Sequence, residues 1–207
     1  AALSTATHIT HQRDVETGSH LDRMSRYSQL IARKLADKHQ LTDEFIEHVF
    51  MFAPLHDIGK VAIPDTILLK EGPLNEAERE VMNTHADKGL EIIDHMIANF
   101  NFSSVPHLEI LRNIVRYHHE AMNGLGYPEQ LKAEQIPLEA RIVATADVFD
   151  ALTSTRPYKE AWSVDKALQH MQELSGSQLD ADCVNVLLKE RAEVESIMAQ
   201  FAENLNG

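Results

Sequence analysis

The amino-acid sequence predicts an all-α fold, a single-domain helical bundle of about eight or nine helices. Apolar residues recur at helical spacing through most of the 207 residues, whereas the alternating runs typical of β-strands are nearly absent. The sequence contains no internal repeat, low-complexity tract or linker that would divide it. Hydrophobic residues make up 43% of the chain, which is enough for one core, so we expect residues 1–207 to form one domain.

The first predicted helix carries apolar residues along one face between residues 21 and 35, and Gly18 either starts or interrupts it. The second helix begins near Thr42, a residue type that caps helix N-termini, and continues through an apolar stretch. Gly59 is expected to end it, because glycine tolerates the backbone conformations that follow helices. Together with two prolines and a further glycine, Gly59 marks a loop over residues 59–74.

Polar capping residues mark the later helices. Asn75 followed by Glu78 is a capping-box pattern, and Ser163 precedes an apolar run with helical spacing. Between them, residues 119–137 hold glycines and prolines, so we expect a loop whose backbone these residues shape. The tail over residues 180–204 is typical of one or two amphipathic helices that pack at the edge of the core.

The charge balance excludes several classes of partner. With 19 basic and 32 acidic side chains, the net charge of −13 disfavours nucleic-acid polymers and anionic membrane surfaces. The longest apolar run, residues 49–55, is far too short to span a bilayer. Cys183 is the only cysteine, which excludes a disulfide within the chain and favours a reducing compartment, the cytoplasm. The chain starts at Ala1 without a signal-peptide pattern, and we expect a fragment of a longer protein.

Histidine is abundant for an acidic sequence, with 12 residues in the chain. Imidazole and carboxylate groups together are the ligand set that zinc, iron and manganese sites use. The neighbours His56 and Asp57 follow one apolar helix, and His118 and His119 follow another, so we expect both pairs to project from buried helix ends. His85 follows a helical turn. These residues are candidates for a metal site.

Asp147 is the most informative acid, because it lies in an apolar helix predicted over residues 142–152. A carboxylate in such a helix is costly to bury unless it is paired or bound to a metal ion. An ion pair with a neighbouring arginine such as Arg141 is the alternative explanation. Glu16 and His20 are spaced four apart, so they share one face if the helix is continuous there.

A dense motif lies at residues 118–128, which read HHEAMNGLGYP. It resembles the HHExxxGxGYP signature of HD-GYP domains, a branch of the HD superfamily of metal-dependent phosphohydrolases. Further blocks that match the family follow in its order, at residues 13–23, 56–64, 84–89 and 136–159. The resemblance covers residues 13 to about 190 and implies a helical bundle of the HD/phosphodiesterase type.

The resemblance implies a centre of two or three divalent metal ions, built from imidazoles and carboxylates. The ligands implied for the first ion are His20, His56, Asp57 and Asp147. The ligands implied for the second ion are Asp57, which would bridge the two, with His85, His118 and His119. A third ion, present in some members of the family, would add Glu16. Iron or manganese is expected, with zinc, nickel and cobalt as alternatives.

The family hydrolyses cyclic di-GMP, a bacterial second messenger, to linear pGpG and in some members onward to GMP. Metal ions in such a centre polarise the phosphodiester and activate a bridging water as hydroxide. The resemblance implies catalytic roles for Asp57 and Lys60, the latter beside the leaving oxygen. The implied substrate-binding residues are Lys60, Tyr127, Asp150, Arg156 and Lys159. Packing of the loop by Tyr127 and ordinary surface charges at the three cations are the alternatives.

Two positions depart from the family pattern. Asn123 stands where the signature usually has aspartate, and Ala86 stands where proline is common. Asn123 leaves open a cyclic dinucleotide-binding module with weak turnover, and a hydrolase that prefers cyclic GMP-AMP is a further alternative. A different HD phosphohydrolase, acting on nucleotides such as guanosine tetraphosphate, is disfavoured by the intact GYP block. An upstream regulatory domain is expected, and a homodimer is left open.

Overall fold

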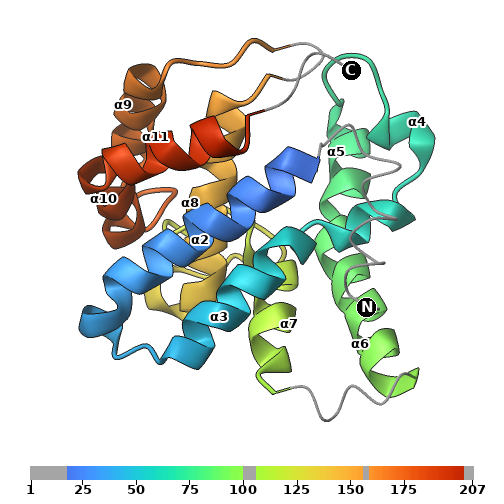
Figure 1. The fold of residues 1–207 in the computed structure, drawn as a ribbon. Coiled ribbons are helices and arrows are strands. Elements are labelled where there is room, and N and C mark those ends of the chain that lie inside the picture. The colour runs from blue at the N-terminus through green and yellow to red at the C-terminus, as the bar shows by residue number, and fades with distance from the viewer. Residues whose placement is uncertain (1–17, 100–105, 156–158, 203–207) are drawn as a thin grey trace.

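The computed structural model describes residues 18–99, 106–155 and 159–202. Within these ranges the fold is all-α, with nine α-helices of eight residues or more and one isolated β-bridge, so the predicted class is confirmed (Figure 1). The α-helices are α2 (Gly18–His39), α3 (Asp43–Phe52), the short α4 (Asp65–Leu68), α5 (Glu76–Asn83), α6 (His85–Asn99), α7 (Leu108–Tyr117), α8 (Leu138–Thr153), α9 (Val164–Leu174), α10 (Ala181–Lys189) and α11 (Arg191–Gln200). The 3-10 helices are η1 (Ala53–Leu55), η2 (Ile58–Ala62) and η4 (Ala133–Gln135).

Helix α2 lies at the centre of the packing. It contacts α3, α8, α10 and α11, while α6 packs against α7 and η2 (Figure 1). The rings of Tyr27 on α2 and Phe149 on α8 are fully buried and meet edge to face, with centroids 5.3 Å apart. Such aromatic pairs stabilise a core beyond the area that they bury. The core therefore ties α2 and α8 together, and these two helices also carry candidate metal ligands.

Helix starts follow the capping residues that the sequence marks. The Thr42 hydroxyl accepts a hydrogen bond from the Phe45 amide, and Asn75 and Glu78 form a complete capping box. Ser163 caps α9. The expected tail of one or two helices is present as α10 and α11. These elements are therefore confirmed.

The segment predicted as a loop over residues 59–74 is partly helical, because it contains η2 and α4. Helices of four or five residues are too short for an apolar period to reveal them. Gly59 does not end a helix but lies inside η2. A Cβ there would lie 1.8 Å from the carbonyl oxygen of His85 and 2.6 Å from the amide nitrogen of Gly89. The two glycines thus let η2 approach the backbone of α6, which brings the segment around Asp57 next to His85.

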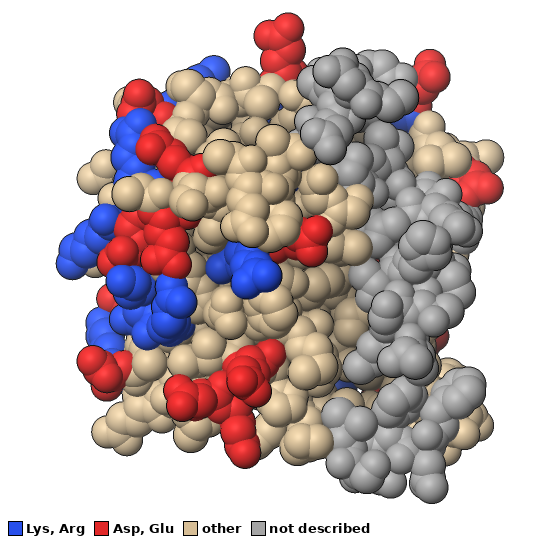
Figure 2. Space-filling view, in the orientation of Figure 1, with Lys and Arg blue, Asp and Glu red and all other residues tan. Residues whose placement is uncertain are grey.

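Acidic and basic side chains lie side by side along the left edge of the face shown in Figure 2, whereas much of the rest of that face carries neither. Ion pairs join α2 to the C-terminal helices, including Lys38 to Asp182 at 2.6 Å and Lys34 to Glu190 at 3.1 Å. Exposed pairs of this kind contribute little to stability. Among the described helices, none combines the length and the apolar character needed to cross a membrane.

Candidate metal centre

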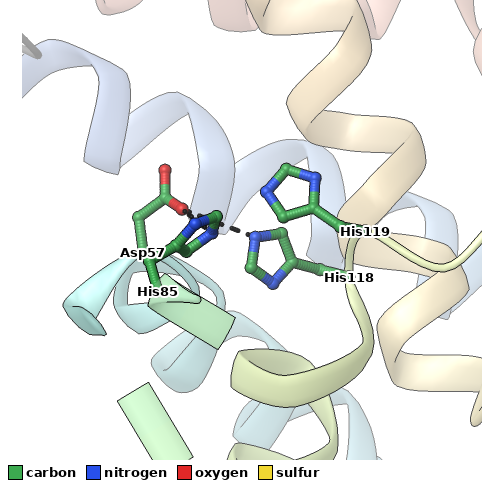
Figure 3. A group of neighbouring side chains, drawn as sticks. All are labelled: Asp57, His85, His118 and His119. Carbon is green, nitrogen blue, oxygen red and sulfur yellow. Dashed lines mark ion pairs between the residues drawn. The ribbon is translucent and has the colours of Figure 1, made fainter. Parts of the chain in front are cut away.

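Seven of the eight candidate ligands lie in the described residues, and they come together from five segments of the fold. The eighth, Glu16, lies outside the described residues. The ligands fall into two groups. Within each group, the donor atoms all lie within 4.8 Å of one another. The first, called here the His20 group, contains His20 on α2, His56 after η1 and Asp147 on α8. The second, the His85 group, contains Asp57, His85, His118 and His119 (Figure 3).

Asp57 faces both groups. Its Oδ1 atom lies 3.2 Å from Nε2 of His85 and 3.4 Å from Nε2 of His118, the two contacts drawn in Figure 3. Its Oδ2 atom lies 3.2 Å from Nε2 of His56. On the other side, His56 Nε2 lies 3.8 Å from Asp147 Oδ1. One carboxylate thus stands between the two groups, as a bridging ligand would.

Main-chain carbonyls orient three of the imidazoles. His56, His85 and His118 each place Nδ1 within hydrogen-bonding distance of a carbonyl oxygen three or four residues earlier in the chain. The pairs are His56 with Ala53 at 2.8 Å, His85 with Met82 at 2.8 Å, and His118 with Ile114 at 2.9 Å. Because a carbonyl only accepts, Nδ1 donates in each case, and Nε2 is presented to the centre.

The donor atoms fit a divalent metal ion. Nε2 of His56, His85 and His118 and Oδ1 of Asp57 are buried and make no hydrogen bond within the described structure. Buried polar atoms of this kind are costly unless something satisfies them, and a cation at the centre of each group would do so. Imidazole nitrogens and carboxylate oxygens are donors that transition metals accept. The residues present therefore fit the metal centre that the sequence implies.

The electrostatics of the two groups differ. Burial lowers the pKa of His118 and, more strongly, that of His119, so both imidazoles are neutral at neutral pH. Burial acts the same way on His56, but the charges of Asp57 and Asp147 outweigh it and raise the pKa to about 9. Burial opposes ionisation of Asp57, yet Lys60 and His56 hold its pKa well below the ordinary range. Asp57 is therefore a carboxylate, and a metal ion must compete with a proton on His56.

The loop after His119 borders a cavity beside the centre. The cavity has a volume of about 390 Å³, and its lining includes His118, His119, Tyr127, Asp147 and Leu179. This volume is within the range of small-molecule pockets. The Tyr127 ring stacks on His119, with centroids 4.8 Å apart and planes 19° from parallel. A ligand in the cavity would thus have access to members of both metal groups.

A family model described as HD domain matches residues 16–183 of this chain. The chain belongs to the HD domain family. Its relatives also confirm the resemblance to HD-GYP domains, the branch that its motifs indicate.

Two relatives and one solved structure show which HD-domain proteins this chain is similar to. It is 46% identical over 200 residues to the cyclic di-GMP phosphodiesterase response regulator RpfG of Xanthomonas campestris pv. campestris, covering 97% of the chain and 50% of that protein. It is 35% identical to the 3'3'-cGAMP-specific phosphodiesterase 2 of Vibrio cholerae, covering 92% of the chain and 34% of that protein. The crystal structure of a cyclic GMP-AMP specific phosphodiesterase of V. cholerae has a TM-score of 0.60 at 22% identity, covering 98% of this chain and 50% of that one. The chain spans about half the length of RpfG, and less of the second relative.

Several predicted residues of the HD domain have contacts that sequence alone did not indicate. Lys60 Nζ lies 2.8 Å from Asp57 Oδ2, so its charge is next to the carboxylate that faces both ligand groups. Lys159 Nζ donates to the Ala151 carbonyl at 2.7 Å and lies 5.2 Å from the centre of the Trp162 ring. Lys159 thus contacts other groups of the protein in this structure. Arg156, predicted to bind the substrate, lies outside the described residues.

Asp150 requires a correction. It was predicted to contact substrate, but it is only 1% exposed, and its Oδ2 atom lies 2.7 Å from Nδ1 of His20. Its Oδ1 atom accepts a hydrogen bond from Arg23. Arg141, suggested as an ion-pair partner of Asp147, instead pairs with Asp180 at 2.5 Å. Asp147 stays partly exposed at the cavity, with 21% of its side-chain surface accessible.

Glu120 is a residue whose role the sequence did not indicate. It is buried, and its two carboxylate oxygens accept hydrogen bonds from the amides of Glu129 at 2.6 Å and Leu131 at 3.0 Å. It therefore holds together the two ends of the loop that carries Tyr127. Its position in the signature, directly after two candidate ligands, pointed to a role for Glu120. No local pattern in the sequence indicates which amides would donate to it.

Two further signature positions shape the same loop. A Cβ at Gly126 would lie 2.4 Å from the Ala121 amide nitrogen and the His119 carbonyl oxygen, so only glycine fits there. Asn123 Oδ1 accepts a hydrogen bond from the Leu125 amide at 3.0 Å. An aspartate carboxylate could accept the same bond, so Asn123 preserves this turn while removing a charge.

Proposed function

We propose that this HD domain is a metal-dependent phosphodiesterase that hydrolyses cyclic di-GMP to linear pGpG, with further hydrolysis to GMP as the alternative end point. The observation that carries the proposal is the pair of ligand groups that meet at Asp57 beside a cavity. The identity of 46% with a protein named as a cyclic di-GMP phosphodiesterase supports this choice of substrate.

The proposed metal ligands form two sets that share Asp57. The first ion would be held by His20, His56, Asp57 and Asp147. The second ion would be held by Asp57, His85, His118 and His119. A third ion would add Glu16. We favour iron or manganese, with zinc, nickel or cobalt as alternatives, because the donors are nitrogen and oxygen without thiolate. When bound, such ions polarise a phosphodiester and favour deprotonation of water.

The chain's own residues divide the remaining work between binding and charge stabilisation. Lys60, which lies beside Asp57, contacts a phosphate oxygen of the substrate and stabilises the leaving oxygen as the P–O bond breaks. Burial raises the pKa of Tyr127, which therefore stays a neutral phenol and donates a hydrogen bond to the substrate. His119, stacked on Tyr127, fixes the position of that ring. Arg156 is proposed to read the guanine base, and Lys159 would do so by exchanging its contact with the Ala151 carbonyl for one with the base.

The direct test is hydrolysis by purified chain loaded with Mn²⁺ or Fe²⁺. We expect cyclic di-GMP to be converted to pGpG, measured by separation of the nucleotides, and Asp57→Asn to lose both metal and activity. Asp37→Asn is the matched control, because Asp37 is exposed on α2 and belongs to neither ligand group. Full activity of Asp57→Asn, or of protein stripped of metal, would contradict the proposal.

Cyclic GMP-AMP is the second candidate substrate. The 35% identity with a 3'3'-cGAMP-specific phosphodiesterase supports it less strongly than the 46% identity with RpfG supports cyclic di-GMP. Rates measured with the two cyclic dinucleotides in one competition experiment would decide between them. A binding module with weak turnover would instead retain cyclic di-GMP without product. The cytoplasmic location, the upstream regulatory domain and the homodimer stay predictions from the sequence.

A further inference from the structure

His20 is oriented differently from three of the other candidate ligands. His56, His85 and His118 each rely on a main-chain carbonyl three or four residues away. The Nδ1 atom of His20 instead lies 2.7 Å from a carboxylate oxygen of Asp150, which is 130 positions later in the chain. The orientation of this imidazole therefore depends on how α2 and α8 are packed.

Asp150 is held in turn by a network of buried groups. Arg23, one turn after His20 on α2, donates from Nε to Asp150 Oδ1 at 2.5 Å and from Nη2 to Oδ2 at 3.2 Å. The Ser154 hydroxyl donates to Oδ2 at 3.2 Å. Both Arg23 and Asp150 are buried, with 5% and 1% of their surface exposed. The guanidinium balances the charge of the carboxylate, so Asp150 can remain ionised inside the protein.

Arg23 also makes a hydrogen bond at the end of a third helix, α11. Its Nη1 atom donates to the Phe201 carbonyl at the end of α11, at 2.9 Å, and Nη2 also donates to Ser154 Oγ at 2.8 Å. The guanidinium is therefore anchored to both α8 and α11. Neither it nor Asp150 has the freedom to turn toward the cavity without breaking several buried hydrogen bonds.

We propose that Asp150, clamped by Arg23, is the positioning residue for His20. Since an ionised carboxylate only accepts, it holds the hydrogen of His20 on Nδ1 and presents Nε2 to the metal of the His20 group. It also makes the imidazole a more basic ligand, as carboxylates behind metal-bound histidines do. The inference rests on the proposed function in one respect, namely that the His20 group binds a metal ion.

The experiment measures metal affinity rather than activity. Equilibrium dialysis against Mn²⁺, with metal counted by mass spectrometry, is applied to the wild-type chain and to Asp150→Asn. We expect one ion to bind with wild-type affinity and the other to bind about 10- to 100-fold more weakly. Glu139→Gln is the matched control, because Glu139 is another buried acid on α8 that contacts Asn113 and not His20. It should leave both affinities unchanged.

A double-mutant cycle separates positioning from a general structural role. In a His20→Ala background, the ligand through which Asp150 acts is gone, so Asp150→Asn should then cause no further loss of Mn²⁺ affinity. Equal weakening in both backgrounds, or wild-type affinity for both ions in Asp150→Asn, would overturn the inference. Failure of the wild-type chain to bind Mn²⁺ would instead count against the proposed function.

Arg23→Lys keeps the inference testable where Asp150→Asn fails to fold. The lysine retains the charge but not the planar fork that contacts both oxygens of Asp150. We expect a weaker affinity for one ion only, smaller in size than for Asp150→Asn. An unchanged affinity for both ions in Arg23→Lys would contradict the clamp.

Discussion

The two halves of the candidate metal centre are held by different means. In the His85 group, His85 and His118 are aimed by carbonyls of their own neighbouring turns, and a close backbone contact at Gly59 brings Asp57 to them. In the His20 group, His20 depends on a side-chain network that links α2, α8 and the end of α11. His85 and His118 are thus oriented by main-chain carbonyls, whereas His20 is oriented by side chains of a distant helix. Substitutions should be able to damage one half without the other.

The largest effect is expected at Gly59, where the backbone of η2 lies against the backbone of α6. Gly59→Ala would place a Cβ 1.8 Å from the His85 carbonyl, and a backbone atom cannot move aside as a flexible side chain can. We expect a loss of about 3 kcal/mol in the free energy of unfolding, measured in urea, together with weaker binding of the His85-group ion. Gly18→Ala is the control, since nothing lies within 4 Å of a Cβ there. Equal stability of the two variants would contradict this account of Gly59.

Glu120→Gln tests the loop that covers the His85 group. A glutamine has one acceptor oxygen, so it can serve only one of the two amides that Glu120 now satisfies. The unsatisfied amide should lower the free energy of unfolding by about 2 kcal/mol and raise the KM for cyclic di-GMP. Chemical denaturation and steady-state kinetics would measure the two effects. Glu134→Gln, at an exposed position of the same loop region, should change neither.

The pH dependence of metal affinity should differ between the halves. Burial lowers the pKa of His56, but Asp57 and Asp147 raise it from 6.5 to about 9 in the protein without a cation. Because the metal displaces this proton, the Mn²⁺ affinity of the His20 group should rise up to about tenfold per pH unit between pH 6.5 and 9. His118 and His119 are neutral throughout that range, so the His85 group should show a flatter profile.

The raised pKa of His56 also predicts how the stability of the metal-free protein depends on pH. A group whose pKa is raised by folding contributes stability below its unfolded pKa, and the contribution disappears as the pH rises through the folded pKa. The His56 contribution should therefore be complete below pH 6.5 and lost by about pH 9. Thermal unfolding in the presence of a chelator would detect it. A stability profile identical in wild type and His56→Ala would contradict the assignment.

Asn123→Asp should have the smallest effect. The aspartate can accept the Leu125 amide as the asparagine does, so the free energy of unfolding should change by less than about 0.5 kcal/mol. The added charge would lie at the cavity lining, and we expect only a modest change in kcat. A large gain in activity would instead favour the binding module with weak turnover as the natural state of this chain.

The sequence predicted the elements that local chemistry determines. Capping at Thr42, Asn75 and Ser163 placed three helix starts, because a cap depends on residues three positions apart. The short η2 and α4 were missed, since neither is long enough to show an apolar period.

Contacts between distant parts of the chain were the least predictable. The candidate ligands were found through a motif, and the structure places seven of them in two groups. The partner of His20 was not found, because 130 positions separate it from Asp150 and no local spacing records that contact. For the same reason the sequence did not show that Arg141, considered as the alternative partner of Asp147, pairs with Asp180.

The central claim is that two metal-ligand groups sharing Asp57 perform phosphodiester hydrolysis. Its most direct test is to count the metal bound to each chain by mass spectrometry while following the products formed from cyclic di-GMP. We expect two or three ions per chain in the wild type with formation of pGpG, and loss of both metal and product in Asp57→Asn. Conversion of cyclic di-GMP at the wild-type rate by a chain that holds no metal would contradict the account.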